Sequence, residues 1–299
     1  MIVIFGSLNA DLIFELDVAP APGETLLAKR FRMEAGGKGA NQAVAAARDG
    51  AEAAMVGAVG ADPLQHVAVG QLAGCGVDMS RIRTATLDTG CASILVDAQG
   101  RNQIAVALGA NGEAAADQVD DELLGRADWL LLQMESRPAE VAALLVRAHA
   151  AGVRTILNLA PAIRLDAAVL RLCSLLVVNE SEARSVAGWL GCGDGARALH
   201  EALGIDVLRT LGERGAEAAT ADGDCFVPAH PIAAVDTTAA GDCFVGVLAA
   251  ALDRGDTLRH AMQRASKAAA LACTRSGSQS SLPWKADIDA WVPATDATV

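Results

Sequence analysis

The stretch that decides how this chain folds is AVDTTAAGDCF, residues 234–244, followed by an apolar helical pattern that continues to about Leu252. Thr, Ala and Gly make a loop of small residues, and Asp242 stands where the expected helix begins. Small residues let backbone N–H groups converge, and the positive end of the helix dipole faces the same place. The segment therefore predicts a site that can hold a phosphate group beside one carboxylate.

Asp242 needs a chemical reason to be there, because a carboxylate repels a bound anion. The simplest reason is that it removes a proton from a hydroxyl group that attacks the phosphorus. This interpretation favours a kinase of small hydroxylated molecules. The alternative is an ordinary glycine turn in which Asp242 is only a favourable charge at a helix N-terminus.

Outward from this loop, the hydrophobic pattern alternates between strand and helix along the chain. Several strand-like runs are apolar throughout, as expected when helices cover both faces of a sheet. We therefore predict an α/β fold with a doubly wound, mainly parallel sheet. The expected strands are residues 2–5, 54–59, 129–133, 155–159, 175–178 and 207–211, and the expected helices are 42–48, 138–151, 166–173, 180–190 and 196–203.

Two regions lack the intervening helices that a parallel sheet requires. Residues 12–18 and 26–33 are extended segments joined through prolines and a glycine, and residues 91–96 and 103–108 predict a hairpin. These segments predict a small second sheet that acts as a lid over the site. One face of such a lid would be left bare, so we expect a homodimer that pairs two lids.

The domain organisation follows from these elements. We expect a single domain over residues 1–299, with lid strands contributed by about 12–33 and 90–109. The tail after about Pro293 is expected to be disordered.

Composition limits the possible partners and location. The 299 residues are 52% apolar and 20% charged, with a net charge of −12, which argues against nucleic acid or an anionic membrane as a partner. No apolar run approaches the roughly 20 residues of a membrane span, and the N-terminus leads directly into a strand. The seven cysteines have no CxxC spacing and predict free thiols. We therefore expect a cytoplasmic protein.

Polar residues gather where a ligand would bind an open α/β sheet. Asn9 and Asp11 follow the first expected strand, and Glu135 ends the strand around 129–134. Gly36-Gly37-Lys38-Gly39-Ala40-Asn41 precedes a helix and matches neither a P-loop nor a dinucleotide fingerprint. Each residue alone has a bland explanation as a turn former or solvated side chain. Together they indicate a binding site for a polyol. The Asp11 carboxylate could accept hydrogen bonds from two neighbouring hydroxyl groups of such a ligand.

Two further segments end strands. In Asn179-Glu180-Ser181-Glu182, the first and last residues can orient waters on a magnesium ion, although the same residues also satisfy a helix cap. The glycines of the segment 210–215, TLGERG, can admit a nucleotide or form a plain turn. The five histidines share no motif with a Ser or Cys nucleophile, so a hydrolase triad is not expected.

In order and spacing, these segments resemble the ribokinase branch of the ribokinase-like (PfkB-type) carbohydrate kinases over nearly the whole chain. Gly36 to Ala43 looks like the first family signature, and Asp236 to Asp242 fits the second. Asn179 to Glu182 fits the magnesium motif NxxE. The resemblance implies transfer of phosphate from ATP to a sugar hydroxyl, with D-ribose 5-phosphate as the expected product.

The resemblance also assigns roles. It makes Asp242 the catalytic base, with Ala239, Ala240 and Gly241 as the anion hole. It implies substrate contacts from Asn9, Asp11, Gly37, Lys38, Gly39, Asn41 and Glu135, and from Asp242 itself. ATP and Mg²⁺ contacts fall on Asn179, Glu182, Thr210, Gly212, Gly215 and Gly241. An activating K⁺ would lie among Asp236, Thr238, Ala272, Arg275, Gly277 and Ser281.

The chain departs from the family pattern at three places: Leu159 where a proline is common, Ser266 near the adenine, and the loop 278–281, which lacks a common proline. These departures leave base preference and cation affinity open. The alternatives are a kinase of another sugar or of a nucleoside, such as deoxyribose, fructose or adenosine, and a catalytically silent sugar-binding protein. A dinucleotide-dependent oxidoreductase lacks its fingerprint.

Overall fold

A nine-stranded sheet forms the centre of the computed structural model, which describes residues 1–99 and 101–292. The strand order is β13-β12-β11-β10-β9-β8-β1-β4-β5, and all neighbours from β11 to β5 are parallel. Only the β11–β12 and β12–β13 pairs are antiparallel among these described strands. The strands are β1 Ile2–Phe5, β4 Ala53–Val59, β5 Asp78–Thr84, β8 Trp129–Gln133, β9 Arg154–Asn158, β10 Leu175–Asn179, β11 Asp206–Thr210, β12 Ala216–Thr220 and β13 Gly223–Val227.

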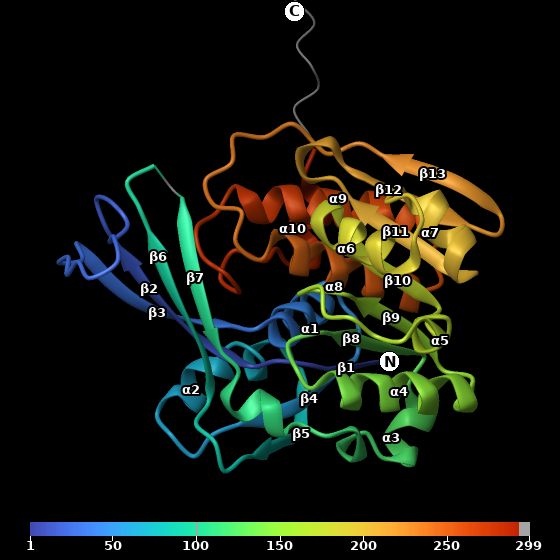
Figure 1. Ribbon diagram of the computed structural model, residues 1–299, viewed down its shortest axis with the longest axis horizontal. Coiled ribbons are helices and arrows are strands. Elements are labelled where there is room, and N and C mark those ends of the chain that lie inside the picture. Colours follow the sequence, from blue (N-terminus) through green and yellow to red (C-terminus); the bar gives the residue numbers. More distant parts are fainter. Residues whose placement is uncertain (100, 293–299) are drawn as a thin grey trace, which may run out of the picture.

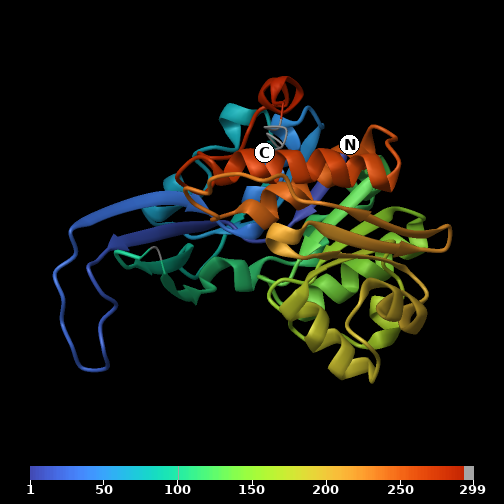
Figure 2. The ribbon, with the colours of Figure 1, turned by 90° about the horizontal axis from the view of Figure 1, so that it is seen from above.

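Helices cover both faces of this sheet (Figure 2). Side chains alternate along each strand, so Ile2 and Ile4 enter one apolar core while Val3 and Phe5 enter the other. The first core is covered by α1 Lys38–Arg48, α2 Leu64–Ala68, α8 Ala240–Asp253, α9 Leu258–Cys273 and α10 Lys285–Ala290. The second is covered by α3 Asp121–Arg126, α4 Pro138–Ala151, α5 Ala167–Leu170, α6 Glu180–Leu190 and α7 Ala196–Leu203. The predicted doubly wound, mainly parallel fold is confirmed.

The expected elements agree with the observed ones to within a few residues, with one helix clearly shorter. Residues 166–173 were predicted as a helix, but α5 is a single turn, Ala167–Leu170, capped by the Asp166 carboxylate. Strands β5, β12 and β13 were not predicted. β12 reads AEAAT, a short run of small and polar residues without the apolar signal of a buried strand.

A separate four-stranded sheet projects from one side of the molecule, at the left of Figure 1. Its order is β3-β2-β6-β7, from β2 Asn9–Glu15, β3 Arg30–Gly36, β6 Gly90–Val96 and β7 Asn102–Ala107. We call these four strands the lid. The β6–β7 hairpin is present as predicted.

The predicted lid differs from the observed one at the limits of its first two strands. Asn9 and Asp11, which follow β1 as expected, lie at the start of the lid strand β2, so this strand begins earlier than residue 12. Residues 26–29 were expected to be extended strand, whereas β3 starts only at Arg30 and Leu27 is 95% exposed. Pro20, Pro22 and Gly23 keep the segment between β2 and β3 out of the sheet, because prolines lack the N–H that a ladder needs. The predicted disordered tail after Pro293 lies outside the described residues.

Helices α1 and α8 lie against each other with their N-terminal ends at the same place. Gly246 of α8 makes this contact possible, because a Cβ there would lie 2.5 Å from the Gln42 carbonyl oxygen of α1. The two N-terminal ends carry the residues singled out by the sequence, Lys38 and Asn41 on α1 and Asp242 on α8. The packing of these two helices therefore fixes the distance between the two sequence signatures.

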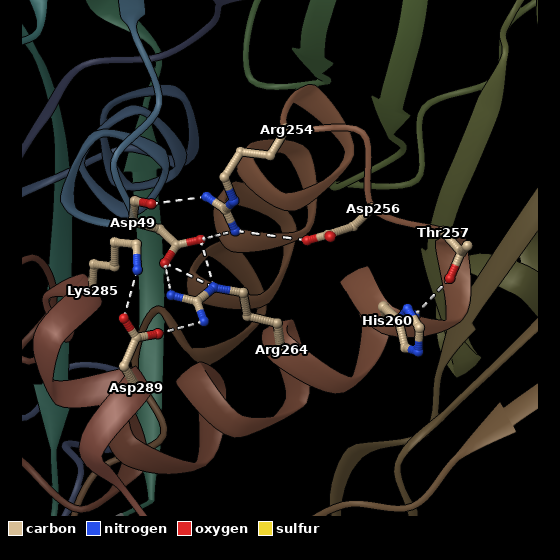
Figure 3. A network of polar contacts seen from close by, with 8 residues as sticks. All are labelled: Asp49, Arg254, Asp256, Thr257, His260, Arg264, Lys285 and Asp289. Carbon is tan, nitrogen blue, oxygen red and sulfur yellow. Dashed lines mark hydrogen bonds and ion pairs between the residues drawn. The ribbon is translucent and has the colours of Figure 1, made fainter.

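The C-terminal ends of the same helices are joined by an ion cluster (Figure 3). The Asp49 side chain follows α1, is fully buried, and accepts hydrogen bonds from Arg254 at the end of α8 and from Arg264 of α9, each at 2.9 Å. Arg264 also donates to Asp289 of α10 at 2.8 Å. Among the described residues, none of the helices has both the length and the apolar character that crossing a membrane requires.

Candidate active site

Asp242 lies in the first turn of α8 and is only 8% exposed. Its Oδ2 accepts a hydrogen bond from Asn41 Nδ2 at 2.9 Å, and its Oδ1 accepts one from Gln42 Nε2 at 2.9 Å. Both donors come from α1. The positive end of the α8 dipole and two neutral amides therefore stabilise this carboxylate, and no residue in the described ranges forms a direct ion pair with it.

The loop before α8 has an unusual backbone. Ala239, the residue at the N-cap of α8, has φ 58°, and it is the one non-glycine residue with positive φ in the described ranges. This left-handed conformation costs an alanine roughly 1–2 kcal/mol. At Gly241 an added Cβ would meet nothing within 4 Å, so the space next to this helix end is open. The Ala240 N–H donates to the Thr237 carbonyl oxygen at 3.2 Å, whereas the backbone at Gly241 borders open space that a ligand could occupy.

A cavity of about 240 Å³ lies between the lid and the N-terminal ends of α1 and α8. It brings together residues that are far apart in sequence and that were predicted to bind substrate: Asn9, Asp11, Gly37, Lys38, Asn41, Glu135 and Asp242. Thr237, Thr238, Ala239 and Ser278 also line it. Gly39 does not, because it is packed against β1: a Cβ there would lie 2.7 Å from the Gly6 carbonyl carbon.

Lid residues that the sequence analysis did not identify form the remaining wall: Ala92, Ile94, Asn102, Ile104 and Val106. The alternation of β6 and β7 places these side chains on one face, since Ala92 pairs with Val106 and Ile94 pairs with Ile104. The signal that could have found them is this period of two, combined with the observation that the lid covers the site.

Asp11 carries a perturbed carboxyl group at the sugar end of the cavity. Burial raises its pKa to about 7, and the charges of Glu135, Glu34 and Asp242 act in the same direction. Glu34 is its partner across the β2–β3 ladder. Gly36 leaves the room that this carboxylate occupies, because a Cβ at Gly36 would lie 2.2 Å from Asp11 Oδ2.

Lys38 supplies the positive charge of the cavity. Its pKa is raised, chiefly by the charge of Asp242 and further by Glu135, while burial opposes the shift. Lys38 Nζ lies 3.8 Å from Glu135 Oε1, and the Lys38 backbone N–H donates to Glu135 Oε2 at 3.1 Å. Ser7 Oγ donates to the same oxygen at 2.6 Å. Glu135 is thereby held at the base of the cavity.

Asn41 lines the cavity where it was predicted to contact the substrate, and it also makes hydrogen bonds within the protein. Its Nδ2 donates to Asp242, and its Oδ1 accepts from Gln279 Nε2 at 3.1 Å and from Ser278 Oγ at 3.4 Å. Although Asn41 lines the cavity, these bonds make it a support for the Asp242 carboxylate. Gln42, Ser278 and Gln279 were missed by the sequence analysis, since a buried amide has no signature of its own in a sequence.

Apart from Gly241 in the first turn of α8, the residues predicted to contact ATP and Mg²⁺ follow or end β10 and β11 and do not line this cavity. Asn179 pairs with Thr210 in the sheet register. Asn179 and Glu182 form a reciprocal capping box on α6, with N···O distances of 2.7 and 2.9 Å. The structure therefore contains the helix cap that was the alternative interpretation of this motif. Gly212 has φ 58° with open space around it, whereas Gly215 is packed against the Val227 carbonyl oxygen of β13.

The pKa of Glu182 is influenced by charged residues of the cavity. Burial raises the pKa of Glu182, the charge of Asp242 acts in the same direction, and Lys38 opposes the shift. The Glu182 carboxylate is therefore near enough to Asp242 and Lys38 for their charges to influence its pKa.

The loop predicted to hold a cation is organised around Asp236. Its Oδ1 accepts from the Thr238 N–H at 2.9 Å and its Oδ2 from the Gly277 N–H at 3.0 Å. Burial acts to raise the pKa of Asp236, but these hydrogen bonds and the charge of Arg32 hold it below its usual value. The carboxylate is therefore ionised at neutral pH and joins the anion-hole loop to the segment 272–281.

The other residues of the expected cation set contribute in different ways. The Ala272 carbonyl oxygen accepts from the Arg275 N–H, while the Arg275 side chain turns outward to Asp287 at 3.2 Å. Ser281 is buried and donates to the Ser278 carbonyl oxygen at 2.8 Å. Within residues 1–99 and 101–292, no three His, Cys, Asp or Glu side chains are grouped as a metal centre.

A model of the pfkB family of carbohydrate kinases matches residues 1–285. The chain belongs to this family. It is 34% identical to a ribokinase of Haemophilus influenzae over 293 residues, which covers 94% of this chain and 95% of the relative. It is 37% identical over 294 residues to a bifunctional ribokinase/ribose-5-phosphate isomerase A of Fructilactobacillus sanfranciscensis, of which it spans 54%.

Solved structures show the same architecture. The crystal structure of a ribokinase from Thermotoga maritima superimposes with a TM-score of 0.89 at 30% identity, covering 97% of this chain and 98% of that one. The structure of an Arabidopsis thaliana ribokinase complexed with ribose and ATP superimposes with a TM-score of 0.86 at 29% identity, covering 96% of each chain.

Proposed function

We propose that the protein phosphorylates D-ribose with ATP to give D-ribose 5-phosphate. The observation that carries the proposal is the cavity, which the Asp242 carboxylate at the N-terminal end of α8 shares with the buried side chains of Asn9 and Asp11 and the partly buried Glu135. A site lined by acceptors suits a polyol, and a carboxylate at an amide-rich helix end suits phosphoryl transfer. Family membership and the ribokinase relatives support the same reaction.

In this mechanism, each residue has a defined task. Asp11 accepts hydrogen bonds from neighbouring sugar hydroxyls, and Lys38 offsets the carboxylate charge around the sugar. Asp242 removes the proton from the attacking hydroxyl as the bond to phosphorus forms. Within the loop of Ala239, Ala240 and Gly241, the Gly241 amide and the positive end of the α8 dipole stabilise the charge that develops on the transferred group.

The nucleotide is proposed to bind along the carboxyl ends of β10 and β11, near Asn179, Thr210, Gly212 and Gly215. A Mg²⁺ ion bound with ATP would offset the charge of the phosphate oxygens. Glu182 would contact the Mg²⁺ ion through water molecules of its hydration shell. Because Glu182 Oε2 accepts a hydrogen bond from the Asn179 N–H, the other carboxylate oxygen, Oε1, is the one that can orient these waters.

A K⁺ site at the Asp236 loop is part of the proposal. Asp236 is ionised in a loop that would face phosphates, and its carboxylate accepts hydrogen bonds from the N–H groups of Thr238 and Gly277. Backbone carbonyls of Thr238, Ala272, Arg275 and Gly277 would supply the remaining ligands of the ion. The simpler explanation is that Asp236 only fixes the turn through Thr238 and Gly277. Equal rates in K⁺, Na⁺ and a bulky organic cation at matched ionic strength would favour the simpler explanation.

We also propose that two copies of the chain pair through their lids. The outer lid residues Phe31 and Met33 and the inner residues Ile104 and Val106 are each about half exposed in one copy. Sedimentation should show a dimer that Phe31→Asp converts to a monomer. The seven free cysteines fit a reducing compartment, so we place the protein in the cytoplasm.

The test of the function is a substrate panel. Purified enzyme is given ATP with D-ribose, 2-deoxy-D-ribose, D-fructose, adenosine or no acceptor, and ADP release and product phosphorylation are both measured. D-ribose should give the highest kcat/KM, with phosphate on O5. Preference for another acceptor would correct the substrate, and binding of ribose without phosphorylation would instead identify a silent sugar-binding protein.

A further inference from the structure

Behind Asp242 lies a chain of buried side-chain amides that none of the assigned roles uses. Gln133 Nε2, at the end of β8, donates to Gln42 Oε1 at 2.7 Å. Gln42 Nε2 in turn donates to Asp242 Oδ1 at 2.9 Å and to Asn158 Oδ1, at the end of β9, at 3.0 Å. Gln42 and Gln133 are fully buried.

The orientation of the Gln42 amide is dictated by its neighbours. Asp242 Oδ1 and Asn158 Oδ1 are both acceptors, so only the NH₂ end of Gln42 can face them. Its oxygen must then face Gln133, which presents a donor. Both hydrogens of Gln42 Nε2 are therefore used, and the amide cannot turn without placing oxygen against a carboxylate.

Gln42 does not line the cavity, and its position behind Asp242 rules out a direct contact with the sugar. Its effect must act through Asp242. A hydrogen bond to a carboxylate in a buried site stabilises the ionised form and fixes its rotamer. Gln42 donates a hydrogen bond to Oδ1 and Asn41 donates one to Oδ2, so two neighbouring residues of α1 together fix the orientation of the carboxylate plane.

We propose that Gln42, anchored by Gln133 and Asn158, is a positioning residue that holds Asp242 in its proton-accepting form and orientation. The proposal rests on the proposed function only in taking Asp242 as the base. The competing explanation is that the amide chain merely satisfies buried polar groups and stabilises the fold.

The two explanations differ in the pH dependence of the rate. The charged groups that influence or are influenced by Asp242 are Lys38 on α1, Asp11 on β2 and Glu182 on α6, and the buried Cys243 thiol is its neighbour on α8. Loss of the Gln42 donor leaves all of these in place. It removes only a hydrogen bond that favours the carboxylate, so the acidic limb of kcat should move to higher pH.

The test uses Gln42→Met, which keeps the length of the side chain but removes its donor. The measurements are kcat against pH at saturating sugar, the sugar KM, and the melting temperature. We expect kcat to fall about 10- to 100-fold and its acidic limb to rise by about one pH unit, since a hydrogen bond to a charged group is lost. The sugar KM should stay within about threefold of wild type, because no sugar contact is removed.

Two further variants complete the design. Gln133→Met removes the anchor alone, so it should shift the acidic limb in the same direction with a smaller loss of kcat, and it provides the same test if Gln42→Met does not fold. Gln65→Met on the half-exposed face of α2 is the matched control and should behave like wild type.

A folded Gln42→Met enzyme with an unchanged kcat and acidic limb would overturn the proposal, as would a lowered melting temperature with no kinetic change. The assay uses whichever acceptor wild type phosphorylates. A wrong sugar therefore does not affect this test, whereas an active Asp242→Asn variant would reject the base assignment itself.

Discussion

Helices α1 and α8 bury an aspartate at each end of their contact, and the two sites differ in how the charge is met. At the N-terminal end, Asp242 is held by the neutral amides of Asn41 and Gln42 and borders a cavity. At the C-terminal end, Asp49 is enclosed by two guanidinium groups and is fully buried (Figure 3). The same type of side chain, an aspartate, therefore lies in two different electrostatic environments at the two ends of this helix pair.

The difference follows from the helix dipoles. Asp242 begins α8, where the dipole already favours a negative charge, so neutral donors suffice and the carboxylate stays available to a proton. Asp49 follows the end of α1, where the dipole disfavours a negative charge, and it requires Arg254 and Arg264. Amide donors leave a base that can react, whereas paired arginines make an ion cluster that only joins helices.

The largest stability effect should come from Asp49→Ala. It leaves two arginines without their buried partner, and breaking a buried ion pair from one side costs about 3–5 kcal/mol. Denaturant unfolding should show this loss, while kcat per folded molecule stays near that of wild type. The control is Lys285→Ala, which removes only an exposed pair with Asp289 and should cost less than about 1 kcal/mol. Equal losses in the two variants would contradict the structural role of Asp49.

A second effect concerns the pH dependence of sugar binding. Asp11 has a pKa of about 7, so it is increasingly protonated as pH falls below 7 and then accepts fewer hydrogen bonds. Ribose affinity should fall by up to about tenfold per pH unit below pH 7. Calorimetric titration between pH 5 and 8 measures this. Asp11→Asn should bind ribose weakly at every pH, and a persistent pH dependence in that variant would assign the effect to another group.

The smallest effect should come from Ala239→Gly. Glycine adopts φ 58° without strain, and this gain is partly offset by the greater freedom of glycine in the unfolded chain. The free energy of unfolding should rise by about 0.5 kcal/mol, while kcat falls a few-fold because the anion-hole loop is less rigid. A loss of stability would show that Ala239 makes contacts that outweigh its backbone strain.

Much of the fold could be predicted because strands and helices of an α/β sheet carry strong local patterns. The strand Trp129–Gln133 and the helix Pro138–Ala151 were predicted at their observed positions. Strands β12 and β13 escaped because they are short and contain small and polar residues. Their strand structure depends on pairing with β11, which is information from the tertiary structure.

The site was predicted in part for a related reason. Asp11, Lys38, Glu135 and Asp242 have chemistry that a sequence displays, and the structure brings them to one cavity. The amide chain through Gln42 depends on contacts between residues more than 90 positions apart in sequence, and the lid wall depends on the pairing of β6 with the distant strand β2. The hydrogen bond from Asn41 to the Asp242 carboxylate likewise depends on how α1 packs on α8.

The central claim is that the aspartate held by amides is the base, and Asp242→Asn tests it most directly. The change keeps the shape of the side chain but removes the group that takes the proton. We predict that kcat falls by roughly 10²–10⁴-fold, while ribose affinity stays within about threefold and the fold is retained. Turnover within a few-fold of wild type, in a sample free of wild-type enzyme, would contradict the account.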